Sequence, residues 1–259
     1  MTYCLAIKVD SGLVFAADSR TNAGVDHVST YSKMHSFVLP GGRFFTLLSA
    51  GNLATTQSVV KRLRADCEQQ SAQSLCGVPD IDAAVSYVGS VSNDVQRIQA
   101  QRDTMNINFE ATFIFGGQIG ENEPAIFLVY PQGNFIHESG AHPFLQMGET
   151  KYGKPILDRV IRRDTPLELA ARCALVSLNS TIRSNITVGP PIELLLYANG
   201  AFTESRHMSL SENDSYYRAL SEAWSEGLRR ALNNLPPFEW EQDLKTAQYV
   251  QDGTAQQQS

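Results

Sequence analysis

Two segments near the start of the chain, residues 2–9 and 13–17, are apolar at almost every position. A strand with one face in water alternates apolar and polar side chains, whereas a strand covered on both faces does not. Asp10, Ser11 and Gly12 lie between the two segments and favour a tight antiparallel turn. The sequence therefore predicts a β-hairpin in a sheet that is covered on both faces.

The remaining predicted elements come in groups. Strands at 35–39 and 43–49 precede amphipathic helices at 52–67 and 80–98, and strands at 109–115, 125–130, 134–138 and 144–147 follow, with a turn-rich link at 116–123. Thr165-Pro166-Leu167-Glu168 predicts a capping box with Pro166 at the first helical position. A strand at 192–198 and a helix at 217–235 complete the order.

Grouped strands and helices disfavour a doubly wound parallel sheet, in which the two types alternate. We therefore expect an α+β fold, a four-layer αββα sandwich of helices, sheet, sheet and helices. No linker or repeat divides the chain, so we expect a single domain over residues 1–240. Residues 241–259 form a polar C-terminal tail whose end we expect to be disordered.

Charge and composition exclude several classes of partner. The net charge of −6 and the lack of a dense basic cluster argue against nucleic acid or an anionic membrane surface as a partner. No apolar run approaches the roughly 20 residues that span a bilayer, and Asp10 interrupts the only short apolar segment at the start. Without an export signal we expect a cytoplasmic protein with reduced cysteines. The cysteines and histidines are scattered, so we expect no metal and no cofactor.

Thr2 directly follows Met1, and a small second residue favours removal of the initiator methionine. Removal would leave a threonine with a hydroxyl nucleophile and a free α-amino group. The reference pKa of such an amine is roughly 7.7–8.0, so it can accept a proton near neutral pH. We expect Thr2 to be exposed by loss of Met1 alone, without a propeptide.

Three further features would lie near Thr2 in the predicted hairpin. Asp18 and Arg20 end the second strand, and Lys33 follows a predicted loop at 21–32 that can return it to the same place. Gly51 lies at a strand-to-helix junction, where backbone N–H groups can hold an oxyanion. A lysine ammonium stabilises a developing alkoxide, and an aspartate keeps that lysine charged and oriented. Together these residue types predict nucleophilic catalysis at Thr2.

Residues 2–7, the Ala17-Asp18-Ser19-Arg20 motif, Ser32-Lys33 and Ser49-Ala50-Gly51 resemble the catalytic β-type subunits of proteasomes. Those subunits are N-terminal-nucleophile hydrolases with an αββα sandwich, and the closer likeness is to the bacterial proteasome-like Anbu subunits. The resemblance implies that Thr2 is the nucleophile, that Asp18 and Lys33 activate it, and that Gly51 donates to the oxyanion. It also implies self-association into a ring or spiral homo-oligomer, and it identifies no ATPase partner.

The same resemblance suggests supporting and substrate-binding residues. Arg20 and Ser19 would support the site, and Thr21, Asn22 and Ser49 would line the substrate site. Where proteasome subunits carry a Gly-Ser-Gly turn and an aspartate, this chain has Gly148-Glu149-Thr150 and Ser184-Asn185. Glu149 and Asn185 would then replace the groups that tune the threonine amine.

Three functions are compatible with these residues. The first is a threonine-type peptidase that hydrolyses peptide amide bonds at Thr2. The second is a structural subunit of a proteasome-like assembly with little activity, which the departures at Glu149 and Asn185 favour. The third is an N-terminal-nucleophile amidase that acts on small amides.

Overall fold

The structure is a computed structural model that describes residues 2–23, 27–71, 73–102 and 107–241. Its internal contacts divide the chain into two compact units, Met1–Arg218 and Ala219–Ser259. The single domain expected over 1–240 stays a prediction. Of the predicted tail, residues 242–259 lie outside the described residues.

The predicted hairpin forms the middle of the first sheet. This sheet has the order β10-β1-β2-β11-β12, with β1 at Tyr3–Val9, β2 at Gly12–Asp18, β10 at Phe144–Gly148, β11 at Ile192–Ala198 and β12 at Arg206–Leu210. All pairings are antiparallel, and Cys4 lies opposite Ala17. Every residue of β1 and β2 is buried, as the unbroken apolar pattern predicts.

The second sheet has the order β5-β6-β7-β8-β9 and faces the first. Its strands are β5 at Met34–Leu39, β6 at Arg43–Gly51, β7 at Ala111–Ile119, β8 at Ala125–Val129 and β9 at Phe135–His137. Apolar side chains of both sheets meet between them, including Phe15, Phe44 and Tyr197. The rings of Phe44 and Tyr197 stack with centroids 4.4 Å apart, which ties the two sheets together.

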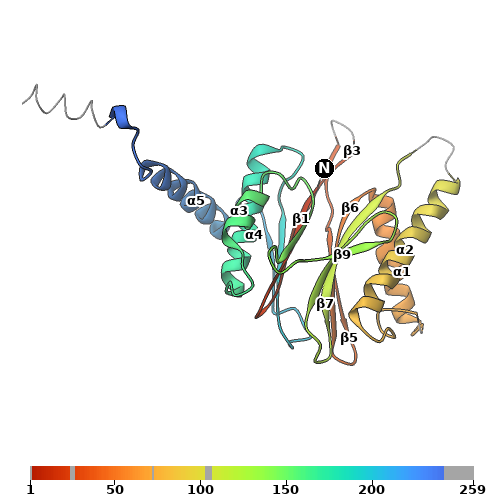
Figure 1. Ribbon diagram of the computed structural model, residues 1–259. Helices are drawn as coiled ribbons and strands as arrows, with labels where there is room; N and C mark the ends of the chain where they lie inside the picture. The colour runs from red at the N-terminus through yellow and green to blue at the C-terminus, as the bar shows by residue number, and fades with distance from the viewer. Residues whose placement is uncertain (1, 24–26, 72, 103–106, 242–259) are drawn as a thin grey trace, which may run out of the picture. The chain divides into compact units, whose positions relative to one another are not determined.

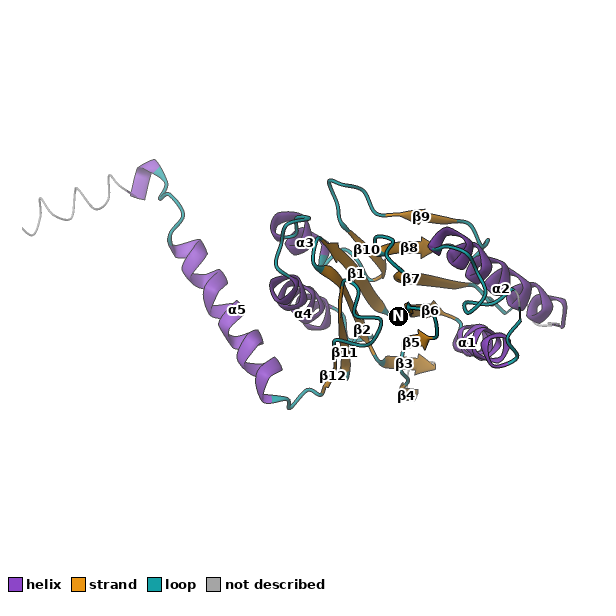
Figure 2. Cartoon of the chain, turned by 90° about the horizontal axis from the view of Figure 1, so that it is seen from below, coloured by secondary structure: helices purple, strands orange, loops and turns teal. Residues whose placement is uncertain are grey.

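Helices cover the outer faces of both sheets (Figures 1 and 2). Helices α1 (Leu53–Glu68) and α2 (Ile81–Arg102) pack on the second sheet through a cluster that includes Val59, Val85 and Phe113. Helices α3 (Lys154–Val160) and α4 (Leu167–Ser184) lie on the first sheet. The observed layers are helices, sheet, sheet and helices, which confirms the predicted α+β sandwich.

Helix α5 (Ser215–Asn233) begins in the first unit and continues into the second. It is amphipathic, and large apolar side chains such as Leu228 and Leu232 are exposed. Within the described ranges, no helix combines the length and the apolar character needed to cross a membrane.

Three local predictions were wrong. Strand β7 continues to Ile119 through part of the expected 116–123 link. A Cβ atom at position 116 would lie 2.8 Å from the Ala125 carbonyl oxygen, and Gly116 fits there because it has no side chain. The expected loop at 21–32 contains a two-stranded ribbon of β3 (Arg20–Ala23) and β4 (His27–Thr30).

The third concerns the expected capping box at the start of α4. Pro166 is the N-cap residue rather than the first helical residue, and no side chain caps the helix. The Thr165 hydroxyl instead accepts a hydrogen bond from the Arg162 backbone N–H at 2.9 Å. Thr165 therefore closes the preceding turn and is not available to the helix.

Candidate active site

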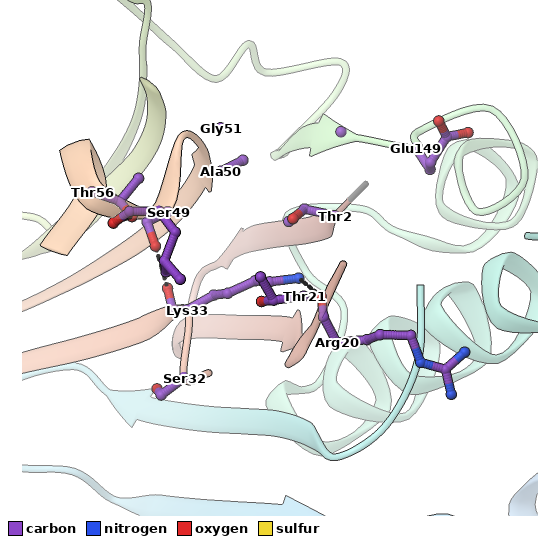
Figure 3. Close-up of a pocket in the computed structure, with 12 residues that line it drawn as sticks. Thr2, Arg20, Thr21, Ser32, Lys33, Ser49, Ala50, Gly51, Thr56 and Glu149 are labelled. Carbon is purple, nitrogen blue, oxygen red and sulfur yellow. Dashed lines mark hydrogen bonds between the residues drawn. The ribbon is translucent and has the colours of Figure 1, made fainter. Parts of the chain in front are cut away.

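A cleft of about 340 Å³ opens beside Thr2 (Figure 3). Most of the predicted site residues line it: Thr2, Arg20, Thr21, Lys33, Ser49, Gly51 and Glu149. The cleft is also lined by residues that sequence reasoning had not assigned a role: Ser32, Ala50, Leu53, Thr56 and Gly148. These residues come from the position before β1, the start of β3, the β4–β5 link, the end of β6, the start of α1 and the end of β10 with the residue after it.

The side chain of Lys33 lies in the cleft below Thr2 in the view of Figure 3. Its ammonium donates to the Asp18 carboxylate and to the Arg20 carbonyl oxygen, each at 2.7 Å. Lys33 is only 6% exposed and Asp18 is fully buried. The pair therefore holds the lysine ammonium at a fixed place, with little solvent, in the cleft that Thr2 also lines.

Asp18 lies behind Lys33 and does not line the cleft itself. Its carboxylate accepts the Tyr3 backbone N–H at 3.0 Å and the Gly189 backbone N–H at 3.3 Å, in addition to Lys33. Burial raises the pKa of the Asp18 carboxyl above its ordinary value, while Lys33 and the two backbone donors act in the opposite direction. One acid thus connects β1, the link before β5 and the segment before β11.

Thr2 is held through its backbone. Its carbonyl oxygen accepts the Glu149 N–H at 2.9 Å. Gly148 adopts a φ of +82°, and a Cβ atom at that position would lie 1.8 Å from the Thr2 carbonyl oxygen. Only glycine permits this close approach of β10 to the residue that would carry the reaction.

The backbone at Gly51 lies where β6 ends and α1 begins. Gly51 is exposed in the cleft and pairs with Ala111 of β7. The next residue, Asn52, caps α1 by accepting the Thr55 N–H on its side-chain oxygen at 3.2 Å. The cap fixes the junction, so the backbone around Gly51 is held rigidly next to the cleft.

Arg20 and Ser19 tie the junction of β2 and β3 to the segment around Gly189. The Arg20 guanidinium donates to the Ile186 carbonyl oxygen at 2.6 Å and points away from the cleft in Figure 3. A Cβ atom on Gly189 would lie 2.3 Å from that guanidinium, so the two residues are in close contact. Ser19 is buried, and its backbone N–H donates to the Gly189 carbonyl oxygen at 3.3 Å. The supporting role expected for both residues stays a prediction.

The two departures from the proteasome pattern lie in different surroundings. Glu149 lines the cleft, and its carboxylate lies 3.4 Å from the Lys151 ammonium. Asn185 does not line the cleft. Its side-chain oxygen accepts the Thr187 backbone N–H at 3.0 Å and the Thr187 hydroxyl at 2.6 Å. The structure brings Glu149 to Thr2 but leaves Asn185 in a turn of its own.

The residues expected to line a substrate site are only partly described. Thr21 and Ser49 line the cleft, and Ser49 donates to the Lys33 carbonyl oxygen through its backbone N–H at 2.9 Å. The side chain of Asn22 lies outside the described residues. Met1 lies outside them as well.

Sequence reasoning missed the anchoring role of Tyr3. Its ring is fully buried, and its hydroxyl shares a hydrogen bond with Ser177 of α4 at 2.7 Å and accepts one from Gln146 of β10. Burial raises the pKa of this hydroxyl, so it stays protonated. A tyrosine inside an apolar strand was the available signal, because a buried hydroxyl needs a partner.

The thiol of Cys4, two positions along the chain from Thr2, is buried and unreactive. Cys4 is fully buried, and burial raises the pKa of its thiol well above the ordinary value. The thiol is therefore protonated and has no access to solvent. Among the described residues, no group of three His, Cys, Asp or Glu side chains could hold a metal ion.

Comparison with known proteins gives consistent matches. A sequence model of the proteasome subunit family matches residues 2–195. The structure is similar to Anbu (ancestral beta-subunit) from Yersinia bercovieri, with 41% identity, a TM-score of 0.86, and coverage of 92% of this chain and 99% of that one. An Anbu (Gly-1) mutant from Hyphomicrobium sp. strain MC1 matches with 44% identity, a TM-score of 0.86, and coverage of 92% and 100%.

A third structure, described as the helical assembly of the Anbu complex from Pseudomonas aeruginosa, matches with 44% identity and a TM-score of 0.85. The match covers 91% of this chain and 98% of that one. A search of curated proteins found no match.

Proposed function

Because the chain belongs to the proteasome subunit family, and within it to the Anbu proteins, we propose that it is a threonine-type peptidase with Thr2 as its nucleophile. The observation that carries this proposal is the buried Asp18–Lys33 pair beside Thr2. A threonine hydroxyl is a weak nucleophile, and a fixed ammonium within the same cleft is the group that would stabilise its alkoxide.

Loss of Met1 frees the α-amine of Thr2, which serves as the general base. The amine takes the hydroxyl proton directly or through a water molecule, and Oγ attacks the carbonyl carbon of a peptide bond. The Gly51 backbone N–H holds the oxyanion of the tetrahedral intermediate. The leaving amine departs with a proton, and water then hydrolyses the acyl-enzyme and restores the free threonine.

Each supporting residue has a distinct part in this scheme. Asp18 keeps Lys33 charged and oriented, with hydrogen bonds from Tyr3 and Gly189 to hold the acid itself. Glu149 fixes the backbone of Thr2 through its N–H. Its carboxylate lies at the same cleft, where a negative charge favours the protonated form of a nearby amine. Arg20 secures the start of β3 through its contact with the Ile186 carbonyl oxygen.

The experiment combines an intact mass with covalent labelling. Peptide epoxyketones react with a threonine that has both a free hydroxyl and a free α-amine, so one adduct per chain is expected on the wild-type protein. Thr2→Ala should abolish labelling, and Thr2→Ser should keep it at a reduced rate because a hydroxyl remains. Retention of Met1 in the purified protein would rule the mechanism out, because a blocked amine cannot act as the base.

A second function, an assembly subunit with little activity, is favoured by one observation. The side-chain oxygen of Asn185 is bound within its own turn and does not line the cleft, so a group that the resemblance assigns to tuning the amine is displaced. An exposed Thr2 that gives no epoxyketone adduct would support this alternative. Turnover of small amides but not of peptides in a substrate panel would support the amidase instead.

We also propose that the chain associates with itself. The relative from Pseudomonas aeruginosa is described as a helical assembly, and this chain covers nearly all of that protein. Closed rings and open spirals differ in whether the subunit rotation closes. Electron microscopy of the full chain distinguishes the two.

A further inference from the structure

The link between β4 and β5 carries Lys33 into the cleft, and it is tied down on three sides. On one side the Tyr31 backbone N–H donates to the Ser19 carbonyl oxygen at 3.0 Å. On another the Lys33 carbonyl oxygen accepts the Ser49 N–H at 2.9 Å. The third tie comes from Glu193 of β11, a residue to which neither the sequence motifs nor the proposed mechanism gives a role.

The Glu193 carboxylate contacts two consecutive residues of this link. Both of its oxygens lie 2.9 Å from the Ser32 hydroxyl, and Oε2 accepts the Lys33 backbone N–H at 3.3 Å. Lys33 is buried, so its N–H needs an acceptor inside the protein. A carboxylate is a strong acceptor for both donors, because hydrogen bonds to an ionised group are stronger than those between neutral groups.

The position of Glu193 in the sheet explains its reach. Strand β11 pairs with β2, and Glu193 lies opposite Ala17, one position from the Ile192–Asp18 pair. Asp18 and Glu193 are therefore diagonal neighbours on adjacent strands. Asp18 binds the far end of the Lys33 side chain, and Glu193 binds the backbone from which that side chain starts.

We propose that Glu193 is a positioning residue for the reaction at Thr2, an inference that rests on the proposed function. It fixes the backbone at Ser32 and Lys33, so that the lysine ammonium reaches Asp18 and the Arg20 carbonyl oxygen rather than solvent. It does not touch substrate. The geometry needed for catalysis is tight, and displacement of a catalytic group by about 1 Å can cost about 100-fold in rate.

The test compares Glu193→Ala, Glu193→Gln and a control, Glu204→Gln. Glutamine keeps an acceptor of the same reach, whereas alanine removes it. Glu204 lies between β11 and β12 and pairs at 3.4 Å with His207, so its substitution removes the same charge away from the cleft. Thermal unfolding of each variant shows whether it has folded.

The readouts are the maximal rate of epoxyketone labelling and the apparent affinity for the inhibitor before the bond forms. We expect Glu193→Ala to lower the maximal rate about tenfold or more, with little change in that affinity, because the ammonium is displaced while the cleft remains. Glu193→Gln should recover most of the rate, and Glu204→Gln should match the wild type. A Glu193→Ala protein that labels at the wild-type rate would overturn the proposal.

A crystal structure of each Glu193 variant separates this proposal from the proposed function. In Glu193→Ala the Lys33 ammonium should leave Asp18, and in Glu193→Gln it should stay. If the wild-type protein gives no adduct, the peptidase proposal fails, but the structures still decide the role of Glu193. A Lys33 that keeps its contact with Asp18 in Glu193→Ala contradicts the positioning role whatever the activity.

Discussion

The Asp18–Lys33 pair gives a quantitative prediction, because loss of Asp18 and loss of Lys33 should lower the free energy of unfolding by different amounts. Asp18→Ala leaves the Lys33 ammonium, the Tyr3 N–H and the Gly189 N–H without the acceptor they share. Removal of one partner from a buried ion pair typically costs about 3–5 kcal/mol, and we expect Asp18→Ala to lower the free energy of unfolding by that amount.

Lys33→Met should cost less at mildly acidic pH. The Asp18 carboxyl keeps its two backbone donors in this variant, and it can relieve its buried charge by binding a proton. Burial already raises its pKa in the wild-type protein, and loss of the opposing lysine raises it further. The folded variant then binds more protons than the unfolded chain, so its stability falls as the pH rises towards the raised pKa. The slope is at most about 1.4 kcal/mol per pH unit.

The test is a double-mutant cycle of the wild type, Asp18→Ala, Lys33→Met and the double variant. The free energy of unfolding of each protein is measured by urea unfolding followed by circular dichroism, at one protomer concentration. At pH 5, Asp18→Ala should be the less stable single variant, and the difference should narrow at pH 8. The double variant should cost less than the sum of the single ones, with a coupling of about 1–3 kcal/mol. Additive effects, or an Asp18→Ala loss below about 1 kcal/mol, would refute the reasoning.

Two further predictions concern positions near the cleft and on β5. Gly148→Ala places a methyl group against the Thr2 carbonyl oxygen, so it should break the hydrogen bond that this oxygen accepts from the Glu149 N–H. The variant should therefore react with the epoxyketone about tenfold more slowly, or slower still. An unchanged labelling rate would contradict the close approach of Gly148 to Thr2. Burial and the nearby Arg64 lower the pKa of His35 to about 4, so the fold holds it neutral while the unfolded chain protonates near pH 6.5. Stability should therefore fall by up to about 3 kcal/mol as the pH drops from 6.5 to 4, and His35→Gln, compared by urea unfolding, should lose that part of the pH dependence.

The core elements could be predicted from the sequence because their side chains follow the packing. The hairpin of β1 and β2 is buried at every position, so its apolar pattern has no breaks. The elements that were missed do not bury a continuous face. Strand β12 is exposed at four of its five positions, and α3 buries only Leu157. Short segments of this kind form because they pair with or pack on neighbouring strands and helices. A local sequence pattern does not predict such tertiary contacts.

The candidate site divides in the same way. Thr2, Asp18, Lys33 and Gly51 could be picked out by residue type, and all except Asp18 line one cleft. The residues that hold these four in place could not be picked out by residue type. Glu193 lies 160 positions along the chain from Lys33, and Ser177 lies 174 positions from Tyr3. Such contacts depend on strand order and register, which a single sequence does not fix.

The carboxylate of Asp18 joins residues 3, 33 and 189, which are spread over most of the chain's length. During synthesis residues 3, 18 and 33 leave the ribosome within a few dozen residues of one another. The segment at 189 leaves the ribosome much later, and long-range pairings of this kind form slowly. In an unfinished chain the Asp18 carboxylate therefore lacks its Gly189 donor, so the set of contacts that holds Lys33 is completed only after the segment at 189 has been made.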